Sequence, residues 1–340
     1  MKTLNLHLAM FSTIFIGAVF AQSPKPSMKA IVVHEYGGPE VLKYEEIPRP
    51  EPKEDQILIR VIAAGVNPVD GMIRSGEFAK YEKDVFPMIP GADIAGVVEK
   101  VGSKITKFKA GDPVFAYVSL KEGGGYAEYA LGTQGDTAAK PKSVTYVEAA
   151  AVPIVALTAW QALIDTAKLS AGQTVLIHGG SGGVGSFAIQ IAKARGAKVI
   201  ATASTANQDL LRQLGADVAI DYTKQKFEDV AKDVDVVLDS VGKDTLARSY
   251  DVVKKGGIIV SLVARPNQAE LDKHGIRGAP ISVDPNADEL GEIGKLIDQK
   301  KIKVIVSQTL PLSDAAKAHE QVATGHTRGK IVLKVADEPK

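Results

Sequence analysis

Cysteine is absent from this sequence of 340 residues. Without a thiol the chain has no disulfide, no cysteine nucleophile, no iron–sulfur cluster and no thiolate-bound zinc. A surplus of either charge is absent too, because 41 Lys and Arg residues stand against 40 Asp and Glu residues. This balance gives no indication of a nucleic-acid partner or of binding to an anionic membrane. The length and a hydrophobic fraction of 45% predict about two globular domains.

Charged side chains are also missing between Lys2 and Lys25. This stretch contains the apolar run Leu8–Val19 and ends with small side chains three positions and one position before Gln22. A short basic start, an apolar run and a small-residue exit are typical of a secretory signal peptide, so we expect residues 1–27 to lie outside the fold. The run is shorter than the ~20 apolar residues that cross a bilayer, which disfavours a membrane anchor or any stable membrane span.

Short strand patterns, broken by Gly and Pro, fill residues 28–151. They cover Lys29–His34, Gln56–Ala63, Ala95–Val101 and Pro113–Val118. Short β-branched runs between such breakers are typical of β-domains with many turns. The first domain is therefore expected to be β-rich and barrel-like.

The pattern changes at about residue 152, where apolar strand patterns begin to alternate with helical ones. The strand patterns are Thr174–His178, Lys198–Ala203, Val218–Asp221, Asp235–Leu238 and Gly257–Val263, with helical patterns over Val184–Arg195 and Asn207–Leu214. Apolar strands alternating with helices indicate a parallel sheet with both faces covered, here over residues 152–306. The remaining residues, 307–340, hold a helical pattern at Ser313–Thr324 and a strand pattern at Lys330–Val335. The fold class is α/β.

A glycine-rich turn follows the first of these apolar strands. Gly180, Gly182 and Gly185 form a Gly-x-Gly-x-x-Gly motif between the strand pattern and the next helical pattern. Such glycines permit a tight turn, let the backbone approach a pyrophosphate and let the helix pack closely on the strand. The N-terminus of the helix then offers N–H groups to the phosphates. The motif in this context predicts a Rossmann dinucleotide-binding site.

The residues at the end of the next strand pattern indicate which cofactor binds. Sites that prefer NADH carry Asp or Glu there, to bind the 2′-hydroxyl of the ribose. In this chain residues 202–207 contain hydroxyl and amide side chains and no acid. A carboxylate would repel a 2′-phosphate, whereas these groups accept it, so NADPH is favoured over NADH.

Several motifs together resemble a known family. They are Gly65–Asp70 (GVNPVD), Pro90–Val98 (PGADIAGVV), Ala110–Val114 (AGDPV), His178–Gly185 (HGGSGGVG), Leu214–Asp217 (LGAD) and Asp239–Gly242 (DSVG). In combination they are similar to the medium-chain dehydrogenase/reductase superfamily, and within it to the zinc-independent quinone oxidoreductases and NADPH-dependent alkenal reductases, the zeta-crystallin group. The resemblance covers nearly all of residues 28–335. It implies a GroES-like catalytic domain over 28–151, completed by 307–340, a Rossmann domain over 152–306, and a homodimer as a possible assembly.

The resemblance also implies which residues meet the cofactor. Asn67 would lie near the nicotinamide ribose, Thr158 near the nicotinamide amide, and Lys330 would be the closing basic residue beside the cofactor. Further contacts are implied at Gly180, Ser181, Gly182, Gly183 and Val184 for the pyrophosphate, at Ser204 and Tyr222 for the 2′-phosphate, and at Leu262 and Val263 for the nicotinamide pocket. Simpler interpretations stay open: Asn67 as a turn residue, Thr158 as a helix residue and Lys330 as a solvated strand end.

No metal is expected, because the zinc members of the superfamily use Cys and Gly-His-Glu where this chain has Asn67 and Gly91-Ala92-Asp93. Without a Lewis acid, hydride delivery to a quinone or an α,β-unsaturated carbonyl is easier than alcohol oxidation. The expected function is therefore an NADPH-dependent quinone or enone reductase. A non-enzymatic NADPH-binding protein and an NADH-dependent enoyl or alcohol dehydrogenase-like enzyme are the alternatives.

Three further features depart from the relatives or leave a question open. Gln208 stands where several relatives carry a Lys for the 2′-phosphate, and Met72 and Phe78 stand where an active-site Tyr is common. No general acid is assigned, and Tyr81 is the only nearby phenol and so the only candidate. The signal pattern predicts a periplasmic or secreted protein, whereas a translation start at Met28 would make it cytoplasmic, where NADPH is expected.

Overall fold

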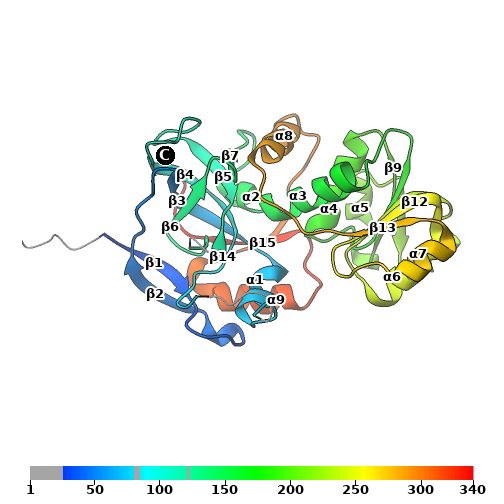
Figure 1. The fold of residues 1–340 in the computed structure, drawn as a ribbon, viewed down its shortest axis with the longest axis horizontal. Helices are drawn as coiled ribbons and strands as arrows, with labels where there is room; N and C mark the ends of the chain where they lie inside the picture. Colours follow the sequence, from blue (N-terminus) through cyan, green and yellow to red (C-terminus); the bar gives the residue numbers. More distant parts are fainter. Residues whose placement is uncertain (1–25, 80–84, 121–122, 340) are drawn as a thin grey trace, which may run out of the picture.

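The computed structural model describes residues 26–79, 85–120 and 123–339. Figure 1 shows two bodies side by side, each built on its own sheet, with helices packed between them. Among the described residues, no helix is both long enough and apolar enough to cross a membrane.

The first body is a mixed sheet of seven strands in the order β14-β15-β3-β4-β5-β7, with β6 paired to β3. These are β3 (Gln56–Val66), β4 (Asp93–Val101), β5 (Pro113–Tyr117), β6 (Tyr129–Thr133), β7 (Thr137–Ala139), β14 (Val306–Pro311) and β15 (Lys330–Lys334). The central strand β3 pairs antiparallel with β4, β6 and β15, and almost all of its side chains are buried. The end of the chain therefore lies against the middle of the first body.

Smaller elements complete this body. Strands β1 (Ser27–Val32) and β2 (Lys43–Pro48) form an antiparallel pair. Ser27 pairs with Pro48 in it, so the expectation that residues up to 27 lie outside the fold is wrong at Ser27. Helix α1 (Pro68–Arg74) begins immediately after β3 and packs against α9 (Ala315–Ala323) from the end of the chain. Figure 1 shows these two helices next to each other on one side of the sheet.

The second body is a parallel sheet of six strands in the order β10-β9-β8-β11-β12-β13. Its strands are β8 (Thr174–Ile177), β9 (Lys198–Ala203), β10 (Val218–Asp221), β11 (Val234–Asp239), β12 (Val253–Ser261) and β13 (Arg277–Pro280), and its helices are α4 (Gly183–Ala194), α5 (Gln208–Gln213), α6 (Lys243–Ser249) and α7 (Gln268–His274). Strand β11 is buried along its whole length, as expected for a parallel strand covered on both faces. The predicted α/β class, with a GroES-like body and a parallel Rossmann sheet, is confirmed.

Helices between the two sheets contribute to an apolar cluster that both bodies share. They are α2 (Tyr146–Ala150), α3 (Pro153–Trp160) and α8 (Ala287–Asp298), and every residue of α3 is buried. One apolar cluster includes Phe115 of β5, Leu157 of α3 and Ile177 of β8, and so reaches from one sheet to the other. The relative placement of the two bodies is therefore fixed by packing, and the segments that meet between them are held close together.

Candidate active site

The glycine-rich turn joins β8 to α4 and fits a pyrophosphate. A Cβ atom on Gly185 would lie 2.3 Å from the carbonyl oxygen of Gly179, so only glycine permits this close approach. A Cβ on Gly182 would have no protein atom nearer than 3.4 Å, which leaves the outer side of the turn open. Helix geometry leaves the N–H groups at the start of α4 without an intrahelical acceptor. The open side and these donors together suit a phosphate group.

A segment near the end of the chain contacts this turn. The N–H of Gly329 donates to the carbonyl of Ser181 at 2.8 Å, and Gly329 and Gly182 form an isolated parallel bridge. A Cβ on Gly183 would lie 3.3 Å from Cδ of Lys330. Lys330 therefore lies directly beside the turn, although its strand belongs to the first sheet.

Lys330 takes part in a buried polar cluster with Asn67 and Asp93. The ammonium Nζ donates to Asn67 Oδ1 at 2.5 Å and to the carbonyl of Val66 at 2.6 Å, and lies 3.5 Å from Asp93 Oδ2. Asn67 Nδ2 donates to the same carboxylate oxygen at 2.9 Å. Lys330 is 4% exposed and Asp93 is fully buried, so Lys330 is not a solvated strand end. Both ends of the Asn67 amide are held, which fixes its orientation.

Asp70 extends the cluster on the other side of Asn67. Its Oδ2 accepts the backbone N–H of Asn67 at 2.8 Å, which caps α1, and the hydroxyl of Tyr126 at 2.9 Å. Its Oδ1 is buried and has no hydrogen-bond partner among the described residues. Asn67 is thus more than a turn residue, because it joins two buried carboxyl groups and one ammonium.

Burial controls the protonation of this cluster. It raises the pKa of Asp70 to about 7, although the hydrogen bonds from Asn67 and Tyr126 act in the opposite direction. Burial also raises the pKa of Asp93 and lowers that of Lys330, and in each case the charge of the partner opposes the shift. Two carboxyl groups with one ammonium can share a proton here, because a single positive charge cannot compensate both carboxylates.

Thr158 lies in the middle of α3 and is 7% exposed. Its hydroxyl donates to the carbonyl of Ile154 at 2.7 Å, one helical turn earlier. The proton of this hydroxyl is thereby used, and its oxygen keeps a free lone pair. Such a group can accept a hydrogen bond from a ligand amide, and the same α3 contacts the glycine turn, because a Cβ on Gly183 would lie 2.9 Å from Cγ1 of Val155.

The ends of β9 and β10 bring Ser204 and Tyr222 together. The two strands pair in parallel with Ala203 opposite Asp221, and the N–H of Tyr222 donates to the carbonyl of Ala203 at 3.3 Å. Tyr222 is 55% exposed. Gln208 does not point outward, because its Nε2 donates to backbone carbonyls at these strand ends.

Leu262 and Val263 follow the end of β12. The N–H of Leu262 donates to the carbonyl of Asp239 at 2.9 Å, which ties this loop to the end of β11. The buried carboxylate of Asp239 accepts the hydroxyl of Ser261 at 2.8 Å. Val263 is 55% exposed, so the loop presents an apolar side chain to solvent.

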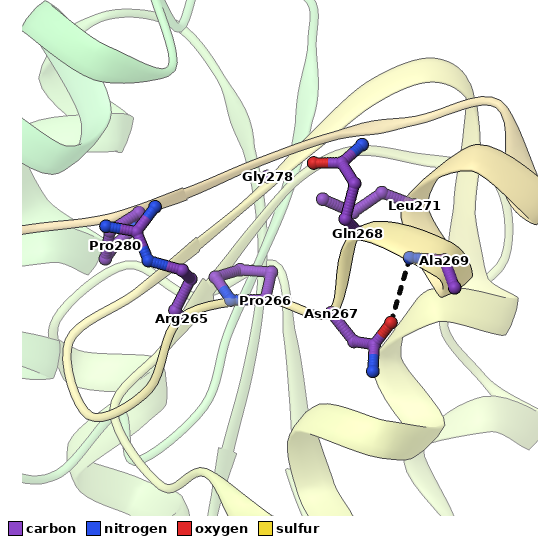
Figure 2. Close-up of a pocket in the computed structure, with 8 residues that line it drawn as sticks. All are labelled: Arg265, Pro266, Asn267, Gln268, Ala269, Leu271, Gly278 and Pro280. Atoms are coloured by element: carbon purple, nitrogen blue, oxygen red, sulfur yellow. Dashed lines mark hydrogen bonds between the residues drawn. The ribbon is translucent and has the colours of Figure 1, made fainter.

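The loop continues into a surface hollow of about 390 Å³, shown in Figure 2. Arg265 and Pro266 line it together with Gly278 of β13, which lies next to Pro266. The side chain of Asn267 caps α7 by accepting the N–H of Ala269 at 2.9 Å. The hollow lies beyond Leu262 and Val263 in the chain and contains none of the residues expected from the sequence.

The structure therefore gathers the expected residues into three places. Asn67, Lys330 and the glycine turn meet between the two bodies, Ser204 and Tyr222 meet at the β9 and β10 ends, and Leu262 and Val263 lie at the end of β12. Tyr81 lies outside the described residues. No group of three or more His, Asp or Glu residues that could hold a metal occurs in the described part of the chain.

Sequence reasoning missed Asp70, Asp93 and Tyr126 as members of the site. Asp93 was noted only as part of a position where relatives bind zinc, and Asp70 only as part of a motif. A signal was present, since both carboxyl groups stand next to apolar runs, where a charge is costly unless it is paired. The partners could not be named because they come from distant parts of the chain.

Comparison with known proteins shows which proteins this chain resembles. Residues 53–142 match the family model described as the alcohol dehydrogenase GroES-like domain, and residues 214–333 match the model described as zinc-binding dehydrogenase. The chain is 42% identical over 324 residues to the chloroplastic NADPH-dependent alkenal/one oxidoreductase of Arabidopsis thaliana, an alignment that covers 92% of this chain and 81% of that protein.

Solved structures give the same result. The quinone oxidoreductase of Coxiella burnetii superposes with a TM-score of 0.85 at 37% identity, covering 91% of this chain and 100% of that one. The quinone oxidoreductase of Escherichia coli in complex with NADPH superposes with a TM-score of 0.81 at 33% identity, covering 90% and 100%. Similarity of this extent covers both sheets and the segments that meet between them.

Proposed function

Because the chain belongs to the zeta-crystallin-like quinone oxidoreductase group of the medium-chain dehydrogenase/reductase superfamily, we propose that it is an NADPH-dependent reductase of quinones or α,β-unsaturated carbonyls. The observation that carries the proposal is the contact between the glycine-rich turn and the buried Lys330–Asn67–Asp93 cluster. This contact places an oriented amide beside a dinucleotide site.

The residues present fit NADPH. The open outer side of Gly182 and the start of α4 would hold the pyrophosphate, Ser204 and Tyr222 would hold the 2′-phosphate, and Thr158 would accept from the carboxamide. When bound, NADPH supplies the hydride for the reduction. The protein contributes orientation, since the Asn67 amide is fixed at both ends before any ligand arrives.

Apolar side chains with high exposure support an apolar acceptor. Met72 of α1 and Phe78 are each 37% exposed, and Val241 and Val263 at the ends of β11 and β12 are 50% and 55% exposed. Side chains of this kind suit a quinone ring or the carbon chain of an enal. Because the carboxyl of Asp70 is fully buried, we propose that solvent protonates the enolate or the reduced quinone.

Purified protein assayed with NADPH against a panel of quinones and short enals tests the proposal. We expect oxidation of NADPH with at least one class of acceptor, and undiminished activity after removal of divalent metals. Binding of NADPH without turnover on any acceptor would contradict the proposal and favour a non-enzymatic NADPH-binding protein. Activity that is lost with the metal would favour a metal-dependent alcohol dehydrogenase.

We also propose that the segment before β1 is a secretory signal. The sequence pattern supports this, and so does the start of the fold, because the carbonyl of Pro26 accepts the N–H of Arg49 at 2.8 Å and Ser27 already pairs with Pro48. A start at Met28 would remove both contacts. N-terminal sequencing of the protein from its host tests the proposal: Gln22 as first residue supports export, and Met28 overturns it.

A homodimer is proposed as the assembly. Strand β13 lies at one edge of the parallel sheet and pairs only with β12 among the described strands, so its other side is available to a second copy. Light scattering on the purified protein tests this, and a mass near 35.9 kDa would contradict it.

A further inference from the structure

A 2′-phosphate carries negative charge and several acceptor oxygens, so its site needs a cation as well as hydroxyl groups. Among the residues that the structure describes, none at the end of β9 offers a free cation. Gln208 stands where relatives carry a Lys. Its Nε2 donates hydrogen bonds to the carbonyl oxygens of Ala203 at 2.9 Å and Ile220 at 3.2 Å. Arg212 lies further along α5 and bonds Asp209 at 2.8 Å. The cation must therefore come from another element.

The neighbouring strand end introduces a carboxylate instead. Asp221 accepts the hydroxyl of Thr205 at 2.6 Å and the hydroxyl of Thr223 at 2.7 Å. Its side chain is 11% exposed, and these hydrogen bonds lower its pKa, so it is ionised at neutral pH. Asp221 thus withdraws two hydroxyl donors from a phosphate and adds a negative charge near Ser204. A 2′-phosphate can bind here only if a cation offsets that charge.

Lys224 is placed to offset the charge of Asp221. Its Nζ lies 3.6 Å from Asp221 Oδ2, the same oxygen that accepts from Thr205, so the side chain leans toward the turn that carries Ser204. At this distance the two groups form an ion pair without a hydrogen bond, and the side chain of Lys224 is 67% exposed. An exposed pair of this kind contributes little stability, so the ammonium can turn to a phosphate at small cost.

We propose that Lys224 holds the 2′-phosphate together with Ser204 and Tyr222, and that it is the residue that makes this chain select NADPH over NADH. The proposal rests on the proposed function only in taking NADPH as the cofactor. Arg248 is less suited to this role. Arg248 lines a hollow of about 500 Å³ beside Tyr222, but its guanidinium bonds Glu228 at 2.8 Å and Asp244 at 2.8 Å.

Calorimetry tests the proposal with Lys224→Ala, Lys224→Arg and the matched control Lys226→Ala, which removes the same charge from the same loop. The ligands are NADPH, NADH and adenosine 2′,5′-bisphosphate. We expect Lys224→Ala to weaken NADPH and the bisphosphate by roughly tenfold, the effect of one charge-assisted hydrogen bond at a partly exposed site. NADH should bind within about twofold of wild type, Lys224→Arg should restore most of the loss, and Lys226→Ala should leave all three affinities unchanged.

Two results would overturn the proposal: equal weakening of NADPH and NADH by Lys224→Ala, or equal weakening of NADPH by Lys224→Ala and Lys226→Ala. The first would assign Lys224 a structural role, and the second would assign the effect to the diffuse charge of the loop. Because the readout is binding, the outcome is independent of turnover. A protein that binds NADPH through Lys224 but reduces no acceptor would contradict the proposed function and leave this inference standing.

Discussion

Lys330 Nζ lies 2.5 Å from Asn67 Oδ1, although the two residues are 263 positions apart in the chain. The bond joins the last described strand, β15, to the start of α1 and, together with the bond from Asn67 Nδ2 to Asp93, fixes the orientation of the Asn67 amide. The same ammonium is the only described cation beside the buried carboxylate of Asp93. The pair is therefore both a structural tie and a means of orienting the amide.

Removing only one charge of the Lys330–Asn67–Asp93 cluster should destabilise the folded protein. We expect Lys330→Met to lower the free energy of unfolding by about 3–5 kcal/mol, because it leaves Asp93 buried without a counter-charge. The double variant Lys330→Met with Asp93→Asn should recover part of this loss. Urea unfolding of the two single variants and the double variant measures the coupling, and strictly additive losses would show that the two charges do not interact.

Two glycines of the turn should respond differently to alanine. Gly185→Ala places a Cβ 2.3 Å from the carbonyl oxygen of Gly179, so we expect loss of thermal stability before any ligand is added. Gly182→Ala meets no protein atom nearer than 3.4 Å, so its melting temperature should stay close to that of wild type. Its methyl group occupies the approach to the pyrophosphate, and we expect NADPH affinity to fall by roughly tenfold or more. Unchanged affinity in Gly182→Ala would place the pyrophosphate elsewhere.

The raised pKa of Asp70 predicts a specific pH dependence. The ordinary pKa is 3.8 and the folded value is about 7, so the folded protein binds a proton between these values that the unfolded chain has released. The contribution of Asp70 to stability therefore falls as the pH rises from about 4 to about 7, and is level above that. Asp70→Asn should remove this component, so its stability relative to wild type should increase across the window by up to about 4 kcal/mol. Urea unfolding from pH 4.5 to pH 8 measures the difference, and parallel curves for the two proteins would refute it.

Thr158 should matter for binding and little for folding. Thr158→Val keeps the shape but removes the oxygen that is free to accept, and its hydrogen bond to Ile154 is a local one within the helix. We expect a change in stability of less than about 1 kcal/mol and a several-fold loss of NADPH affinity, with Thr158→Ser close to wild type. Wild-type affinity in Thr158→Val would make Thr158 an ordinary helix residue.

Several strands of the second body could be predicted closely, because they are apolar runs separated by helices, but β13 was not foreseen and β12 begins four residues before the expected strand. The strands Lys198–Ala203 and Val218–Asp221 have the expected bounds, and α4 differs from the expected helix by one residue at each end. The elements of the first body are harder to predict from the sequence. Strand β2 was not foreseen, since its side chains are mostly exposed and give no clear apolar alternation, and neither was the parallel pairing of β14 with β15.

The site could be predicted where function depends on backbone shape, and only by resemblance where it depends on side chains. Glycines at the turn can be read from spacing alone. The network around Asn67 cannot, because Asp93 and Lys330 reach it from two other strands, and nothing local in the sequence shows that all three are buried together. The reason is that such clusters depend on contacts across the fold, whereas patterns in a sequence report local structure.

The bond from the Gly329 N–H to the Ser181 carbonyl bears on how this molecule could be recombined with its relatives. A chimera that exchanges the Rossmann body alone would keep its glycine-rich turn but receive the Arg328–Lys330 tripeptide of another parent. Gly329 restricts such an exchange, because its φ is +62° and a Cβ there would lie 2.2 Å from the carbonyl oxygen of Ile305. The position of Lys330 against Gly183 restricts it further, because a Cβ at residue 183 would lie 3.3 Å from Cδ of the lysine. The natural unit of exchange is therefore the Rossmann segment together with this tripeptide, two stretches that are separate in the gene and inseparable in the protein.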